Sequence, residues 1–192
     1  MSEPVDSEPA VRRAVFLDRD GVLVRASPNG APMAQLELLP GVEDACALLR
    51  ASGFALIVVT NQPDVARGRI ERADVDAQHE WLRAVLPLDE IVVCMHDDAD
   101  ACVCRKPRPG MLVDSARRHE VALEASVMVG DRWRDVEAGK AAGCRTVFVD
   151  HGYDERQPVG PDAVVTSLAA AVPVILEWPV VPVPADEETS SA

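Results

Sequence analysis

The sequence has few basic residues. Its 192 residues include 19 Lys and Arg against 32 Asp and Glu, which gives a formal net charge of -13 at pH 7. Nucleic-acid-binding proteins usually present a basic face, so this shortage argues against a nucleic-acid partner. An anionic substrate would gain no attraction from the overall charge, and cationic side chains close to it would have to supply that attraction.

Long apolar runs are absent as well. No stretch reaches the ~20 apolar residues of a membrane-spanning helix, and Met1–Ala10 is acidic and polar, without the apolar segment of a secretion signal. We therefore expect a soluble, cytoplasmic protein with no membrane partner. In such a chain, five cysteines are better explained as core thiols, metal ligands or nucleophiles than as a disulfide framework.

The length and an apolar content of 48% suffice for one domain with a substantial core, and they exclude a chain that is disordered throughout. We expect a flexible arm over residues 1–12 and one folded domain over residues 13–176. Prolines and acidic residues near the C-terminus predict a disordered tail over residues 177–192. No internal repeat is visible, and we expect a monomer.

Short apolar runs alternate with amphipathic stretches along the domain. Strands are expected at residues 14–17, 54–59, 91–93, 126–129 and 146–149, and helices at residues 41–50, 70–86, 109–119, 136–142 and 168–176. The second of these helices would turn four apolar side chains inward: Val75, Trp81, Leu82 and Val85. Pro173 would interrupt the last helix. Because each parallel crossover needs a helix, the alternation predicts an α/β fold, a Rossmann-like doubly wound parallel sheet.

Two carboxylates, Asp18 and Asp20, directly follow the first expected strand, and Gly21 comes next. Ligands of open α/β sheets collect outside the carboxyl ends of the strands. Two neighbouring carboxylates repel each other unless a cation lies between them, and Mg²⁺ prefers such oxygen ligands. On these residues alone, a turn that merely ends a strand is an equally good interpretation.

Three more polar clusters lie at or soon after expected strand ends: Thr60-Asn61, Arg105-Lys106-Pro107 and Gly130-Asp131-Arg132. A carboxylate can attack phosphorus while Mg²⁺ and a lysine offset the charge of the phosphoryl oxygens. An acid two residues after the nucleophile projects to the same side of the chain and can protonate the leaving group. Taken singly, Thr60 could be a strand-end cap and Lys106 a solvated surface charge.

Together, these four segments resemble the four motifs of the haloacid dehalogenase-like (HAD) phosphohydrolase superfamily, over residues 15–139. The resemblance implies that Asp18 is the nucleophile and an Mg²⁺ ligand. It implies that Asp20 is the general acid and then the general base, and that its backbone carbonyl also binds Mg²⁺. Thr60 and Lys106 would hold the transferring phosphoryl group, and Asp131 would be the remaining Mg²⁺ ligand.

A second constellation consists of three thiols and an imidazole within eleven residues: Cys94, His96, Cys102 and Cys104. This set fits a tetrahedral structural Zn²⁺ site with no open coordination position. Core cysteines with an unrelated histidine, or a disulfide, are the alternatives. Cys46 and Cys144 lie on expected apolar faces and are assigned to the core.

The loop at 94–104, with Arg105-Lys106-Pro107 after it, resembles the heptose bisphosphate phosphatases and histidinol-phosphate phosphatases within that superfamily. These are compact enzymes without a large cap domain. The resemblance implies that Arg105 and Arg132 contact substrate, and an arginine fork suits a second phosphate. Asn61 and Gln62 are assigned to substrate binding as well. Pro63 departs from the pattern of the heptose enzymes, so the reaction is better specified than the substrate.

The expected function is Mg²⁺-dependent hydrolysis of a sugar phosphate through an aspartyl-phosphate intermediate. The preferred substrate is D-glycero-D-manno-heptose 1,7-bisphosphate at its 7-phosphate, and histidinol phosphate is the alternative. Two alternative functions involve no enzymatic turnover. One is a receiver-like module that stores an aspartyl-phosphate, and the other is a zinc-stabilised binding protein that has lost activity. The receiver-like module has little use for Asp20 as an acid or for the cysteine loop, and the intact set of acids argues against a binding protein that has lost activity.

Overall fold

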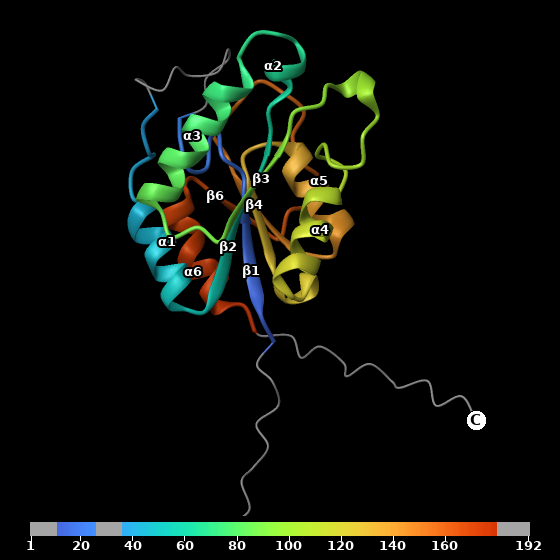
Figure 1. Cartoon of the computed structure of the whole chain (residues 1–192). Coiled ribbons are helices and arrows are strands. Elements are labelled where there is room, and N and C mark those ends of the chain that lie inside the picture. Colours follow the sequence, from blue (N-terminus) through green and yellow to red (C-terminus); the bar gives the residue numbers. More distant parts are fainter. Residues whose placement is uncertain (1–10, 26–35, 180–192) are drawn as a thin grey trace, which may run out of the picture.

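The computed structural model describes residues 11–25 and 36–179 of the chain. Six strands form one sheet in the order β3-β2-β1-β4-β5-β6, and every neighbouring pair is parallel (Figure 1). The strands are β1 (Arg13–Leu17), β2 (Phe54–Asn61), β3 (Glu90–Cys94), β4 (Val127–Gly130), β5 (Arg145–Val149) and β6 (Ala163–Val165). The predicted fold class, a Rossmann-like parallel α/β sheet, is confirmed.

Helices cover both faces of the sheet. One face packs against α1 (Val42–Ala51), α3 (Arg72–Val85) and α6 (Leu168–Glu177), and the other against α4 (Gly110–His119) and α5 (Trp133–Ala142). Alternate residues of β1 point into the two cores, with Leu17 in the first and Phe16 in the second. Shorter turns are α2 (Pro63–Ala66), η2 (Asp98–Asp100) and η3 (Leu123–Ala125). Both faces of the four inner strands, β1, β2, β4 and β5, are therefore buried, as a parallel sheet requires.

The strand order reverses between β1 and β4. From β1 the chain adds β2 and β3 on one side, whereas β4, β5 and β6 extend the other side. The two central strands lie side by side up to their ends, where the backbone N–H of Asp18 donates to Val129 O at 2.9 Å. Such a reversal opens a crevice at the carboxyl ends of the strands. The segments after β1 and β4 therefore face each other.

Several predicted details are wrong. Helix α6 continues through Pro173, whose ring is exposed, and the carbonyl group that the proline cannot pair belongs to the exposed Ala169. Val85 is 37% exposed, and α3 instead turns Gln78 and His79 inward beside Val75 and Leu82. Periodicity cannot reveal buried polar side chains, because it scores only apolar ones.

Strand β6 and helix α2 were not predicted, and helix α5 begins three residues before the predicted start. The arm and the tail fall mostly outside the described residues and stay predictions. At the described end of the chain, Trp178 packs against the core, and the guanidinium carbon of Arg145 lies 5.1 Å from the centre of its ring. Among the described residues, none of the helices combines the length and the apolar character required to cross a membrane.

Candidate active site

A pocket of about 210 Å³ opens at the carboxyl ends of the central strands, where the strand order reverses. It brings together eight of the nine residues predicted for the catalytic or substrate site: Asp18, Asp20, Thr60, Asn61, Arg105, Lys106, Asp131 and Arg132. The ninth, Gln62, is buried behind Asp20. Three lining residues were not predicted: Pro63, Arg134 and Asp135.

Three buried carboxylates form the floor of this pocket. One oxygen from each of Asp18, Asp131 and Asp135 lies within 4.8 Å of the other two. Among the described residues, neither oxygen of Asp131 has a hydrogen-bond partner of normal geometry, although the side chain is only 1% exposed. Nε of Arg132 lies 3.4 Å from its Oδ2, and buried polar atoms without a hydrogen bond are rare in folded proteins. The trio therefore offers the anionic oxygen ligands that a divalent cation such as Mg²⁺ requires.

The pKa values of Asp131 and Asp135 agree with this interpretation. Burial, together with the charges of Asp18 and Asp135, raises the pKa of Asp131 to about 8. Burial and the charge of Asp18 also raise the pKa of Asp135 to about 6, although the nearby Lys106 opposes the shift. Without a cation, these carboxyl groups therefore hold protons well above their ordinary range, and a bound cation would favour the charged forms.

Gly21 allows this close approach. Its backbone is in the left-handed region with φ +82°, and a Cβ atom there would lie 2.0 Å from Oδ2 of Asp131. Any other residue at this position would collide with the carboxylate and would also be strained. The glycine after Asp20 is thus needed for the position of Asp131, which lies 110 residues away in sequence.

Lys106 is the cation at the centre of the pocket, and it is 2% exposed. Its ammonium group lies 2.6 Å from Oδ1 of Asp135 and 2.9 Å from Oδ1 of Asp18, and it donates to Val59 O at 2.7 Å. Burial opposes the charged form, but Asp135 and Asp18 outweigh it and raise the lysine pKa above its usual value. The lysine is therefore charged, and it is not a solvated surface residue.

Asn61 holds the backbone of Lys106. Its side-chain amide donates to Lys106 O at 3.0 Å, and its carbonyl oxygen accepts from Lys106 N at 3.1 Å. Gln62 makes a similar connection, since its amide donates to Oδ2 of Asp20 at 2.9 Å and to Oγ1 of Thr60 at 3.0 Å. Both amides thus bind protein groups that line the pocket.

Arginines surround the mouth of the pocket. Arg105 pairs with Asp98 at 2.8 Å. The guanidinium carbon of Arg132 stands 3.7 Å from the centre of the Tyr153 ring, and its Nη1 lies 3.0 Å from Glu155. These contacts hold Arg105 and Arg132 in fixed positions beside the acids.

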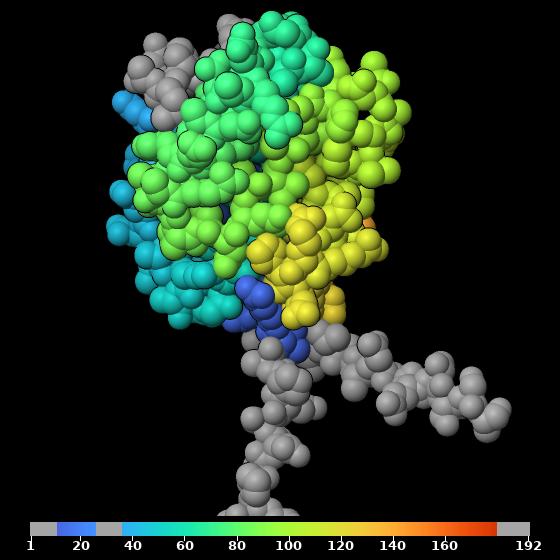
Figure 2. Space-filling view, viewed as in Figure 1, coloured from blue at the N-terminus to red at the C-terminus, as the bar shows by residue number. Residues whose placement is uncertain are grey.

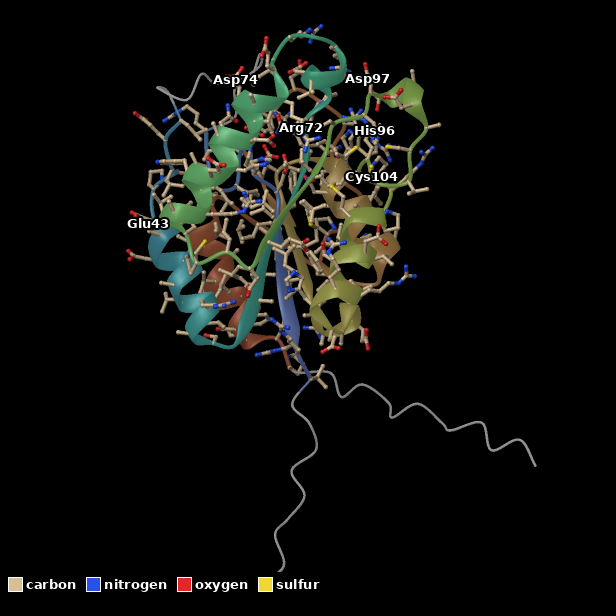
Figure 3. All side chains as sticks on the ribbon, in the orientation of Figure 1. Glu43, Arg72, Asp74, His96, Asp97 and Cys104 are labelled. Carbon is tan, nitrogen blue, oxygen red and sulfur yellow. The ribbon has the colours of Figure 1, made fainter. Side chains whose placement is uncertain are left out.

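The cysteine loop forms a second, separate cluster. The Sγ atoms of Cys94, Cys102 and Cys104 lie 3.3 to 3.7 Å apart, and His96 Nδ1 lies 3.3 Å from the Sγ of Cys104 and 3.6 Å from that of Cys94 (Figure 3). Tetrahedral Zn²⁺ with Zn–S bonds of about 2.3 Å would separate its sulfur ligands by about 3.8 Å. The spacing of the donors therefore fits a zinc ion. None of the five cysteines forms a disulfide, and Cys46 and Cys144 are buried in the core, as predicted.

The cysteine loop forms an ion pair with the segment after β2. Arg67, next to α2, donates to both carboxylate oxygens of Asp97, at 2.6 and 2.8 Å. Figure 2 shows the two segments, turquoise and lime, next to each other at the top of the molecule. Arg105 and Lys106 follow directly after Cys104. The cysteine cluster therefore holds in place the backbone that positions these two basic side chains in the pocket.

Asp135 is the main residue that sequence reasoning missed. Its signal was a second acid only four residues after Asp131, close enough in the chain to reach the same site. The predicted helix began at Val136, whereas α5 begins at Trp133, so Asp135 lies in its first turn. There its Oδ2 also accepts from Arg132 N at 2.9 Å. Asn61 was predicted to bind substrate, and nothing in the sequence indicated its hydrogen bonds to the backbone of Lys106.

The chain is similar in sequence to known proteins. A family model described as HAD-hydrolase-like matches residues 103–171. The D-glycero-beta-D-manno-heptose-1,7-bisphosphate 7-phosphatase of Pseudomonas putida is 39% identical over 152 residues, which are 75% of this chain and 86% of that protein. The enzyme of the same name from Escherichia coli K12 is 37% identical over 163 residues, covering 78% and 83% of the two chains.

Solved structures agree with the sequence comparisons. The D,D-heptose 1,7-bisphosphate phosphatase of Bordetella bronchiseptica, in complex with magnesium and phosphate, superimposes with a TM-score of 0.76 at 34% identity. The superposition covers 86% of this chain and 98% of that one. The corresponding enzyme from Burkholderia thailandensis has a TM-score of 0.62 at 28% identity, over 87% and 100% of the two chains.

Proposed function

Because this chain belongs to the HAD-like phosphatase family, we propose that it removes the 7-phosphate of D-glycero-D-manno-heptose 1,7-bisphosphate. As a member of this family it is a phosphoric monoester hydrolase. The observation that carries the proposal is a group of three buried acids, two of which pair with one buried lysine, at the point where the strand order reverses. The names of the relatives supply the substrate.

We assign the catalytic ion to Mg²⁺, held by the side chains of Asp18, Asp131 and Asp135 and by the backbone carbonyl of Asp20. Neither oxygen of the buried Asp131 accepts a hydrogen bond of normal geometry from a described residue, and Nε of Arg132 lies no closer than 3.4 Å to Oδ2, which supports this assignment. Bound there, Mg²⁺ would stabilise negative charge on the phosphoryl oxygens and orient the phosphate. We assign Zn²⁺ to the cysteine loop as a structural ion, because four protein ligands leave no position open for chemistry.

Asp18 is the proposed nucleophile. Its Oδ1 accepts hydrogen bonds from Lys106 Nζ at 2.9 Å and from Arg19 N at 2.7 Å, and both contacts hold the carboxylate in place. A bond forms between a carboxylate oxygen and phosphorus while the bond to the sugar oxygen breaks. Lys106 lies where it can offset charge on the transferring group, and the hydroxyl group of Thr60 donates a hydrogen bond to a phosphoryl oxygen.

Asp20 is the proposed proton donor. It gives its proton to the departing sugar oxygen, which would otherwise leave as a strongly basic alkoxide. Water then attacks the phosphorus of the aspartyl-phosphate, Asp20 takes up a proton from that water, and Asp18 is regenerated with release of phosphate. Arg105 and Arg132 bind the part of the substrate that does not react, since arginine forks match phosphate oxygens.

The experiment is a measurement of phosphate release with Mg²⁺ present. We expect the highest kcat/KM for the heptose bisphosphate, lower values for hexose phosphates and histidinol phosphate, and loss of turnover in Asp18→Asn and in wild type treated with EDTA. A preference for histidinol phosphate would replace the substrate. No turnover of any phosphate monoester, together with an aspartyl-phosphate that persists for minutes, would favour a receiver-like module instead.

A further inference from the structure

Helix α3 buries two polar side chains. Gln78 is 1% exposed and His79 is 3% exposed, although the outer side of this helix faces solvent. They share the inner face with the apolar Val75 and Leu82. A buried amide or imidazole costs free energy unless it is hydrogen-bonded. Apolar residues would fill this face more simply, so the contacts of the two side chains need an explanation.

Both side chains meet the guanidinium group of Arg19, which is 2% exposed. Nη1 of Arg19 donates to Oε1 of Gln78 at 2.8 Å and lies 3.4 Å from Nε2 of His79. Burial first, and then the charge of Arg19, lower the pKa of His79 to about 4. The imidazole is therefore neutral at pH 7, and its Nε2 can accept a hydrogen bond from Nη1 of Arg19.

The other side of the guanidinium group forms an ion pair with Asp20. Nε and Nη2 of Arg19 lie 3.0 and 2.9 Å from Oδ2 of Asp20, and the Gln62 amide donates to the same oxygen at 2.9 Å. Among residues 11–25 and 36–179, no hydrogen bond is made by Oδ1 of Asp20. The side chain is 32% exposed and lines the pocket. Three donors around Oδ2 therefore leave Oδ1 as the oxygen that can carry a proton.

We infer that Gln78 and His79 of α3 are positioning residues that act through Arg19 to aim Oδ1 of Asp20 at the leaving group. The inference rests on the proposed role of Asp20 as proton donor. Neither α3 residue lines the pocket, so neither is expected to touch the substrate. They hold one side of a planar five-donor group, and the planarity of the guanidinium fixes the direction of its other side.

The consequence is a selective effect on substrates that need the proton. A sugar alkoxide leaves poorly without protonation, whereas p-nitrophenolate leaves readily without it. When Gln78 loses its acceptor, Arg19 is free to turn toward another partner, and Asp20 turns with it. Transfer of phosphate to Asp18 from an aryl ester does not need the proton of Asp20. A role confined to packing would affect both substrates equally.

The test compares kcat/KM for the heptose bisphosphate and for p-nitrophenyl phosphate, because kcat/KM reports the steps up to departure of the alcohol. Gln78→Met keeps the length and helix propensity of the side chain and removes the acceptor. A correctly placed acid contributes about 10²- to 10⁴-fold. We expect Gln78→Met to lower kcat/KM for the sugar phosphate about tenfold more than for the aryl phosphate. Gln78→Glu retains an acceptor oxygen and is expected to restore most of the activity.

Leu82→Ala is the matched control, because it loosens the same helix face without touching Arg19, and it is expected to reduce both activities by the same factor. Asp20→Asn removes the proposed acid itself, so its loss of kcat/KM for the sugar phosphate relative to the aryl phosphate is the largest that the network can cause. Equal losses for both substrates in Gln78→Met, or none, would overturn the inference. If Asp20→Asn loses the same factor of kcat/KM for both substrates, the proposed role of Asp20 is wrong. If the wild type hydrolyses neither substrate, the proposed function is wrong. Should Gln78→Met not fold, His79→Leu provides the same comparison, because it removes the acceptor nitrogen that faces Arg19.

Discussion

The ammonium nitrogen of Lys106 lies 2.6 Å from Oδ1 of Asp135, and each of the two side chains is 2% exposed. Lys106 follows the cysteine loop after β3, whereas Asp135 belongs to α5 after β4. The pair therefore connects the two halves of the sheet across the crevice. With Asp18 and Asp131, one buried cation faces three buried carboxylates, and the excess negative charge matches a divalent ion.

Lys106→Met should destabilise the fold as well as abolish turnover. Removing one partner of a buried ion pair typically costs about 3–5 kcal/mol, because an uncompensated charge stays buried. We expect a loss of this order in the free energy of unfolding, measured with urea in the absence of Mg²⁺. Lys140→Met is the control, since Lys140 is exposed and its ammonium group contacts only the backbone of Val159 in the described chain. Equal stability of the two variants would contradict this role of Lys106.

The stability of the metal-free protein should fall as pH rises. The pKa of Asp131 is raised to about 8 and that of Asp135 to about 6, both from an ordinary value of 3.8. Between pH 4 and pH 8, the folded chain therefore binds more protons than the unfolded chain, and stability is lost through this window. We expect the Tm in EDTA to decrease from pH 5 to pH 8.

Mg²⁺ should reverse this trend, because it binds the charged carboxylates. The rise in Tm on adding Mg²⁺ is expected to be larger at pH 8 than at pH 5. Asp131→Asn provides the comparison, since it removes the group with the larger shift and should flatten the pH dependence in EDTA. A metal-free Tm that is constant or rises from pH 5 to pH 8 would refute the explanation.

Gly21→Ala should abolish activity through Asp131. The new Cβ atom would lie 2.0 Å from Oδ2 of Asp131, so the carboxylate would have to move. Gly143→Ala is a matched control, because Gly143 has a similar φ of +86°, but a Cβ atom there would have no described atom within 4 Å beyond its chain neighbours. Both variants carry a backbone strain of about 1–2 kcal/mol. Only Gly21→Ala is expected to lose phosphate release and the stabilisation by Mg²⁺, measured by colorimetric assay and by Tm. Similar activity in the two variants would rule out the steric argument.

Cys102→Ser should lower the zinc content. The hydroxyl group is a much poorer zinc ligand than a thiolate, and Cys102 belongs to a set of four donors within 4.8 Å. Metal analysis should find about one zinc per chain in wild type and clearly less in the variant, together with a lower Tm. Cys144→Ala changes a buried core thiol and should keep its zinc. Full zinc occupancy in Cys102→Ser would show that the ligand assignment is wrong.

Much of the site could be read before the fold was known. Asp18, Asp131 and Thr60 each lie at or directly after a strand, and parallel strands bring their carboxyl ends to one edge. The grouping of these residues in one pocket therefore followed from strand prediction alone. Strand β6 was not predicted, because its three residues are too few for a periodic signal in the sequence. Its pairing with β5 identifies it in the structure.

The amino-acid sequence by itself determined the α/β class, the acids at the ends of β1 and β4, and the four donors of the cysteine loop, because these features are local in the chain. Only the tertiary structure decided that Asp135 joins Asp18 and Asp131, that Asn61 binds the backbone of Lys106, and that α3 reaches Asp20 through Arg19. Local patterns report the hydrophobicity and spacing of neighbours. Contacts between polar groups far apart in sequence depend instead on how helices and strands pack, and a buried polar side chain looks the same as an exposed one until its partner is in place.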